Sequence, residues 1–76
     1  MTGLHNLKPE RVVEAFIKAG WKRRKTKSSH AKLTREGNIN ILSIPLHKGK
    51  PIKRGLLLNQ IKKAGMTVEE FLKYYK

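Results

Sequence analysis

The sequence predicts an α+β fold in the order helix, three strands, helix and a further short helix. Three features indicate this order: apolar residues at helical spacing near the start, alternating apolar residues in the middle, and a helix-capping signature near the end. With 76 residues the chain has room for one domain, residues 1–76, around a small core. An apolar content of 38% suffices for that core and is too high for a disordered basic tail.

The first helix is expected from about Pro9 to Ala19. Pro9 suits the first helical position, where its missing N–H has no cost. Gly20 suits the left-handed conformation that ends a helix, and Trp21 should seal the helix against the sheet. The apolar side chains expected on one buried stripe are Val12, Val13, Phe16 and Ile17.

Three strands should follow, over residues 21–27, 30–35 and 39–46. Ser28-Ser29 is expected as the first turn, and Glu36-Gly37-Asn38 is a hairpin-turn signal. In such an antiparallel meander, helices cover one face of the sheet. Much of the charge must then lie on the other face or along its rim.

The third strand has the clearest pattern. Ile39 and Ile41 alternate, and the apolar residues from Leu42 onward alternate in the opposite phase. This phase change predicts a bulge or a strong twist near Ile41-Leu42. Pro45 cannot donate a ladder hydrogen bond, so it should lie at the strand's end or on a sheet edge.

The last third of the chain should be helical. A basic loop, residues 47–54, precedes a second helix from about Arg54 or Gly55 to Ala64, with Gly65 ending it. Thr67 and Glu70 form a capping box that starts a third, short helix, with Met66 and Phe71 as the hydrophobic staple. The buried stripe of the second helix should contain Leu57, Ile61 and Ala64.

The basic excess is the dominant compositional feature. Eighteen Lys and Arg residues against five Asp and Glu give a formal net charge of +13. Such an excess favours an anionic partner, whether nucleic acid, an acidic protein or an anionic membrane. The alternatives are solubility alone, for which the imbalance is too large, or residence in a basic complex such as the ribosome.

Several classes of protein are disfavoured. The chain has no cysteine, which excludes a disulfide scaffold and a thiolate zinc site and agrees with a cytoplasmic location. No apolar run is long enough for a membrane span, and no signal peptide is visible. The histidines His5, His30 and His47 are too widely spaced for a zinc site, and acids are too scarce for magnesium. No metal, cofactor or phosphate-loop motif is therefore expected.

The remaining chemical candidate is a histidine in a basic, hydroxyl-rich turn, with Lys25, Lys27, Ser28 and Ser29 before His30. RNA cleavage without a metal needs a base for the attacking 2′-hydroxyl, an acid for the leaving 5′-oxygen, and donors for the phosphorane charge. Histidine titrates near neutrality and can serve as acid or base. A solvated or packing role for His30 is the simpler alternative on these grounds alone.

Two basic runs, residues 22–27 and 48–54, flank the histidine-bearing hairpin and are a candidate phosphate track. Lys50 and Lys53 in the second run are expected to contact RNA. His47 is a candidate second proton-transfer group, or simply a loop histidine. Tyr74 and Tyr75 could stack on bases.

The ordered set of motifs resembles the HicA family of toxin ribonucleases from HicA–HicB toxin–antitoxin systems. The resemblance covers nearly the whole chain. It is carried by Ala19-Gly20-Trp21, Ser29-His30, Ile44-Pro45-Leu46-His47, Gly49-Lys50 with Lys53, Gly55 and Leu57, and the segment Ile61 to Leu72.

This resemblance implies a double-stranded-RNA-binding-like fold, α-β-β-β-α, and an mRNA interferase that cleaves without a metal. The family's catalytic histidine, in a Gly-Ser-His motif, corresponds to His30, and the family's partner is a HicB antitoxin that blocks the active site. Two departures stand out: Ser28 replaces the glycine, and Ala31 and Leu33 replace a second histidine and an aromatic residue. They bear on rate and substrate preference more than on the fold.

Two function classes remain open from sequence. One is a cytoplasmic toxin that cleaves mRNA with His30. The other is a non-catalytic double-stranded-RNA-binding module with the same fold and charge, whose binding would weaken steeply with salt. A small ribosome-associated protein is a weaker third option, because such proteins more often carry long unstructured basic extensions.

Overall fold

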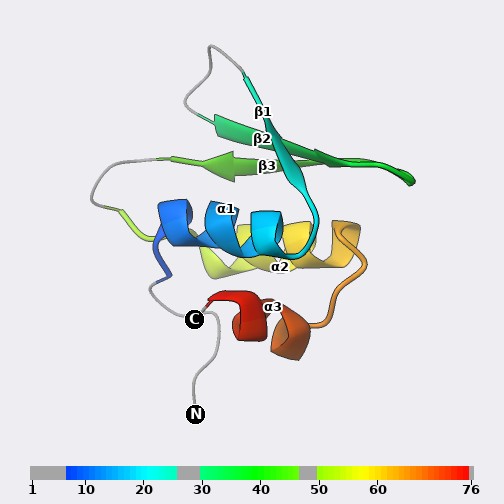
Figure 1. Cartoon of the computed structure of the whole chain (residues 1–76). Helices are drawn as coiled ribbons and strands as arrows, with labels where there is room; N and C mark the ends of the chain where they lie inside the picture. The colour runs from blue at the N-terminus through cyan, green and yellow to red at the C-terminus, as the bar shows by residue number, and fades with distance from the viewer. Residues whose placement is uncertain (1–6, 26–29, 47–49, 76) are drawn as a thin grey trace.

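The computed structural model describes residues 7–25, 30–46 and 50–75. The elements are α1 (Pro9–Lys18), β1 (Lys22–Arg24), β2 (His30–Arg35), β3 (Asn38–Pro45), α2 (Arg54–Lys63) and α3 (Val68–Tyr75). The predicted α+β class and the order α-β-β-β-α with an added C-terminal helix are confirmed. All three helices lie on the same side of the sheet (Figure 1). No helix in the described ranges is long and apolar enough to cross a membrane.

The three strands form an antiparallel sheet in the order β1-β2-β3. The pairing of β2 with β3 is regular as far as Leu33 and Leu42 and then shifts, so that Arg35 pairs with Asn38. This irregularity confirms the bulge predicted from the phase change. Ile39 is 97% exposed and Ile41 56% exposed, while Leu42 is buried.

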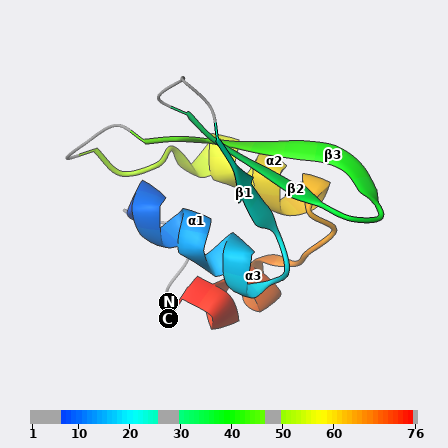
Figure 2. The same cartoon turned by 45° about the horizontal axis from the view of Figure 1, so that its top comes forward.

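The core lies between the sheet and the helices. Ala31, Leu33, Leu42 and Ile44 form the buried inner face of β2 and β3. Figure 1 shows α1 and α2 beneath the sheet, and Figure 2 shows α3 on the far side of α1 from the sheet. The helices contribute a second set of buried residues: Val12, Val13, Ala15, Phe16, Leu57, Ile61, Ala64 and Phe71. Trp21 is 1% exposed and belongs to this core, as predicted.

Two details of the sequence prediction were wrong. Ile17 is 44% exposed and not part of the buried stripe of α1. The buried arc of α1 is centred near Val12 and Phe16 and includes Ala15. At about 100° per residue, Ile17 lies beyond the edge of that arc. The first strand is also shorter than expected: it ends at Arg24, and Lys25 lies outside it.

The predicted helix ends are confirmed. Gly20 and Gly65 adopt φ values of +109° and +73°, the left-handed region that follows a helix C-terminus. The capping box before α3 is reciprocal, because the Glu70 N–H donates to Thr67 Oγ1 at 3.1 Å and the Thr67 N–H donates to Glu70 Oε1 at 2.9 Å. Met66 packs against the core cluster that contains Phe71.

Polar contacts tie α2 to the edge strand β3. Gln60, a buried side chain, accepts a hydrogen bond from the Ser43 N–H at 3.0 Å. The side-chain amides of Asn38 and Asn40 donate to the Lys63 carbonyl at 3.3 and 3.2 Å. These bonds satisfy a carbonyl at the C-terminal end of α2, where no helical partner follows.

Helix α3 packs against α1 and the residue before it at two places, through Phe71 and through Tyr75. The rings of Phe16 and Phe71 lie 4.9 Å apart between centroids. Tyr75 accepts a hydrogen bond from the Lys8 N–H at its hydroxyl, and its carbonyl accepts one from Arg11. The Arg11 guanidinium also lies 4.8 Å from the Tyr75 ring centroid. Tyr75, suggested from sequence as a base-stacking residue, therefore already packs within the protein.

The Phe16–Phe71 contact leads to a stability prediction. Phe71→Ala should lower the free energy of unfolding by about 3–5 kcal/mol, because it empties a fully buried site between α1 and α3. Urea denaturation followed by circular dichroism would measure the change. Tyr74→Ala, at an exposed site on the same helix, is the matched control and should cost less than about 1 kcal/mol. Equal losses in the two variants would contradict this packing.

Candidate functional site

The alternation of β2 sets the direction of its side chains. Ala31 and Leu33 are 2% and 0% exposed beneath the sheet, facing the helices. Successive residues of a strand point to opposite faces. His30 and Lys32 therefore lie on the face that no helix covers, and His30 is the first residue of the strand, as predicted.

A short segment before α2 presents two lysines. Ile52 anchors it, since its side chain is 5% exposed in the core and its N–H donates to the Leu7 carbonyl at 3.0 Å. Lys50 and Lys53 flank this anchor and are exposed. The segment is thereby held against the residues that lead into α1.

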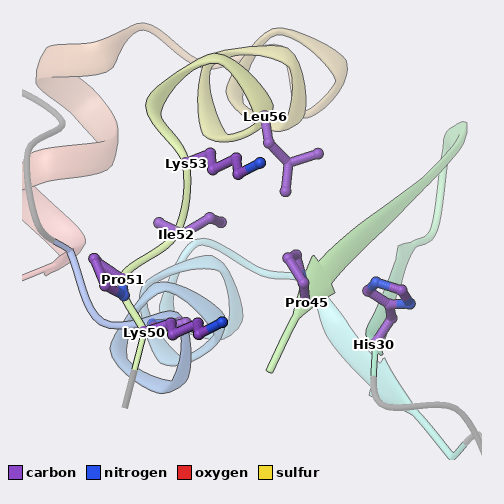
Figure 3. Close-up of a pocket in the computed structure, with 8 residues that line it drawn as sticks. His30, Pro45, Lys50, Pro51, Ile52, Lys53 and Leu56 are labelled. Carbon is purple, nitrogen blue, oxygen red and sulfur yellow. The ribbon is translucent and has the colours of Figure 1, made fainter. Parts of the chain in front are cut away.

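His30, Lys50 and Lys53 line one pocket, where β2 begins, β3 ends, and α1 and α2 begin. The remaining lining is apolar: Pro9, Pro45, Pro51, Ile52 and Leu56. Figure 3 shows the Lys50 and Lys53 side chains extending toward Pro45, with His30 on the opposite side of Pro45 in this view. The pocket holds about 430 Å³, within the range of small-ligand sites.

The start of α2 adds positive potential to this pocket. Lys53 is the N-cap and makes no side-chain capping hydrogen bond, Arg54 is the first helical residue, and the first turn has no acid. The first N–H groups of a helix lack helical acceptors and carry a partial positive charge. Cations at this end are electrostatically unfavourable unless an anion offsets them, and a phosphate group has the required charge.

The uncovered side of the sheet carries further cations. We call it the open face and define it as Lys22 and Arg24 of β1, His30, Lys32 and Thr34 of β2, and Ile41, Ser43 and Pro45 of β3. The Lys32 ammonium donates to Ser43 Oγ at 3.1 Å, which holds it across the strand pair. Lys32 was not among the RNA contacts expected from sequence. Lys32 lies two residues after His30 on the same strand and therefore faces the same side of the sheet. This spacing could have identified Lys32 from the sequence.

The predicted site residues have different outcomes. The structure brings His30, Lys50 and Lys53 together. Lys25 is exposed just after β1 and does not line the pocket. Four others, Lys27, Ser28, Ser29 and His47, lie outside the described residues, and their roles stay predictions. Within the described ranges, no group of three or more His, Asp or Glu side chains is arranged to hold a metal ion.

The fold and this pocket define a small basic α+β protein with a histidine and two lysines at the meeting point of two helix starts and two strand ends. Residues 9–66 match the family model described as the HicA toxin of bacterial toxin–antitoxin systems. Since the match covers more than half of the chain, the chain belongs to the HicA toxin family. Helix α3 lies beyond the matched range. A search of curated proteins found no match.

The pocket should bind a simple anion. Titration with inorganic phosphate, followed by NMR, should shift the backbone amide signals of Lys53 to Leu56. Lys53→Gln should weaken the affinity by up to about fivefold, the effect expected of one exposed ion pair. Lys62→Gln, an exposed lysine at the other end of α2, is the control and should leave the affinity unchanged. Equal weakening by both substitutions would contradict a localised site.

Proposed function

We propose that this chain is the toxin of a toxin–antitoxin pair and an endoribonuclease that cleaves mRNA without a metal ion. Two findings support the proposal: membership of the HicA toxin family and the shared pocket of His30, Lys50 and Lys53. The shared pocket is the observation that carries it, because it unites a group able to transfer protons with cations able to hold a phosphate.

The proposed reaction is an internal transesterification. The 2′-hydroxyl of one ribose attacks the adjacent phosphorus, and the bond from phosphorus to the 5′-oxygen breaks. A base removes the 2′-hydroxyl proton, and an acid delivers a proton to the leaving 5′-oxygen. The products are a 2′,3′-cyclic phosphate and a free 5′-hydroxyl, so the step needs neither water nor a metal.

His30 would act as the acid or the base of this step. Lys50 and Lys53 would stabilise the charge that develops on the phosphorane, together with the positive end of α2. Lys25, Lys27, Ser28 and Ser29, which precede β2 in the sequence, would position the phosphate. His47 would be the second proton-transfer group, since the reaction needs both an acid and a base.

The family also implies the partner and the setting. We propose that a HicB-type antitoxin binds this chain and blocks the pocket, and that an acidic or apolar surface of the antitoxin complements the basic surface. Both proteins would act in the cytoplasm, where mRNA is present.

We also propose that residues 1–76 act as one toxin domain. The match ends at residue 66, yet Phe71 of α3 is fully buried against Phe16 of α1. The hydrogen bonds that Lys8 and Arg11 donate to Tyr75 add to that contact.

The decisive test is cleavage of a defined mRNA in excess EDTA. Wild-type protein should cleave it, and His30→Ala should slow cleavage by at least about 10²-fold, the usual contribution of a general acid or base. Lys73→Ala, which removes an exposed cation of α3 outside the pocket, should cleave at close to the wild-type rate. The product ends, a cyclic phosphate and a 5′-hydroxyl, would be identified by mass spectrometry.

Loss of wild-type cleavage in EDTA would refute the metal-free mechanism. Equal cleavage by wild type and His30→Ala would refute the role of His30. Salt-sensitive binding with no turnover by the wild type would instead favour the non-catalytic RNA-binding module.

A further inference from the structure

We propose that the open face of the sheet binds the RNA backbone beside His30, through Lys22, Arg24 and Lys32. The inference rests on the proposed function for the identity of the ligand as RNA. It goes further by assigning the path of the strand to a surface outside the pocket and to residues other than those that line it.

The register of the sheet places these cations in adjacent rows. Arg24 pairs with Lys32, and Lys32 pairs with Ser43, so one row crosses all three strands. His30 and Pro45 form the next row toward the pocket. Directly opposed side chains lie about 4.5–5.5 Å apart at Cβ. An RNA backbone that runs along the open face toward the pocket therefore contacts Arg24 and Lys32 before it reaches His30.

A third row extends the same surface away from the pocket. Lys22 pairs with Thr34, two residues beyond the Arg24–Lys32 pair. Both Lys22 and Arg24 are exposed, and Lys32 is half-buried with its ammonium held by Ser43. A cation already held in place loses less side-chain entropy on contacting a phosphate.

The acidic residues are segregated from this surface. Glu10 and Glu14 lie on α1, and Glu69 and Glu70 lie on α3, in the layers beneath the sheet. The fifth acid, Glu36, lies in the turn at the end of β2 opposite to His30. The strand residues of the open face thus carry cations and no carboxylate, and the potential there favours a polyanion.

The chemistry of the open face suits phosphates rather than bases. Its side chains are cations, hydroxyls, His30, Pro45 and Ile41, with no Phe, Tyr or Trp among the described residues that compose it. Base stacking on RNA-binding sheets depends on such rings. Phosphate contacts fix position without reading sequence, so binding by this face should be largely independent of base identity.

The test compares two charge-matched double variants. Arg24→Gln with Lys32→Gln removes two cations of the open face. Arg23→Gln with Lys62→Gln removes two exposed cations elsewhere. Arg23 belongs to the basic run 22–27, but it pairs with the buried Leu33, so the structure places it on the opposite side of β1 from Lys22 and Arg24. Lys62 lies on α2. The probe is a fluorescent 2′-O-methyl RNA of about 20 nucleotides, which lacks the attacking hydroxyl, titrated between about 50 and 200 mM salt.

The open-face double variant, Arg24→Gln with Lys32→Gln, should bind the RNA probe about tenfold or more weakly than the wild type. The slope of log affinity against log salt should fall by about 1.4, which is 0.7 for each of two phosphates that the protein no longer neutralises. The control pair should change affinity no more than about twofold. Equal weakening by both pairs would overturn the proposal, because only net charge would then matter. An unchanged affinity of the open-face pair would also overturn it.

Two further measurements separate the inference from the proposed function. The first compares the single variants Arg24→Gln and Arg23→Gln, which change neighbouring residues of β1 and leave the Lys32–Ser43 hydrogen bond in place. Only Arg24→Gln should weaken RNA binding. Cleavage of unmodified RNA is followed with the same proteins. Open-face-dependent binding without cleavage by the wild type would refute the proposed function and leave this inference standing. If cleavage depends on His30 but the two double variants bind RNA equally well, the proposed function stands and this inference is refuted.

Discussion

The two-residue period of β2 is the constraint on which the arrangement depends. Ala31 and Leu33 fill the space between the sheet and the helices, and their burial fixes the side on which His30 and Lys32 lie. A slip of one residue would exchange these sets, burying an imidazole and an ammonium at a cost of several kcal/mol. Core packing thus maintains the orientation of the chemical groups, although these two core side chains do not line the pocket.

Local signals made most of the fold predictable. The Thr67–Glu70 capping box and the phase change at Ile41-Leu42 each depend on residues close in sequence, and both are confirmed. The pocket was harder to predict, because it depends on the Ile52–Leu7 hydrogen bond between distant segments. The exposure of Ile17 was also unpredictable from periodicity, since the neighbouring elements decide which arc of α1 is covered.

The layers of the molecule have different electrostatic characters. Four of the five carboxylates lie on α1 and α3, while the open face and the pocket present lysine, arginine and histidine. A formal charge of +13 distributed in this way gives the protein a directional field as well as a net attraction. A polyanion approaching in solution is therefore oriented toward the sheet and the pocket before any close contact forms.

The hydrogen bond from Ser43 to Gln60 has a consequence for self-association. An edge strand with unpaired N–H groups is a template on which another chain can add a strand. At Ser43 the Gln60 amide occupies that N–H, and Pro45, further along β3, has none to offer. The opposite edge, β1, is only three residues long, and all of them are cations. The Gln60 acceptor and Pro45 therefore limit strand addition at the C-terminal part of β3, and the short, fully cationic β1 limits it at the opposite edge of the sheet.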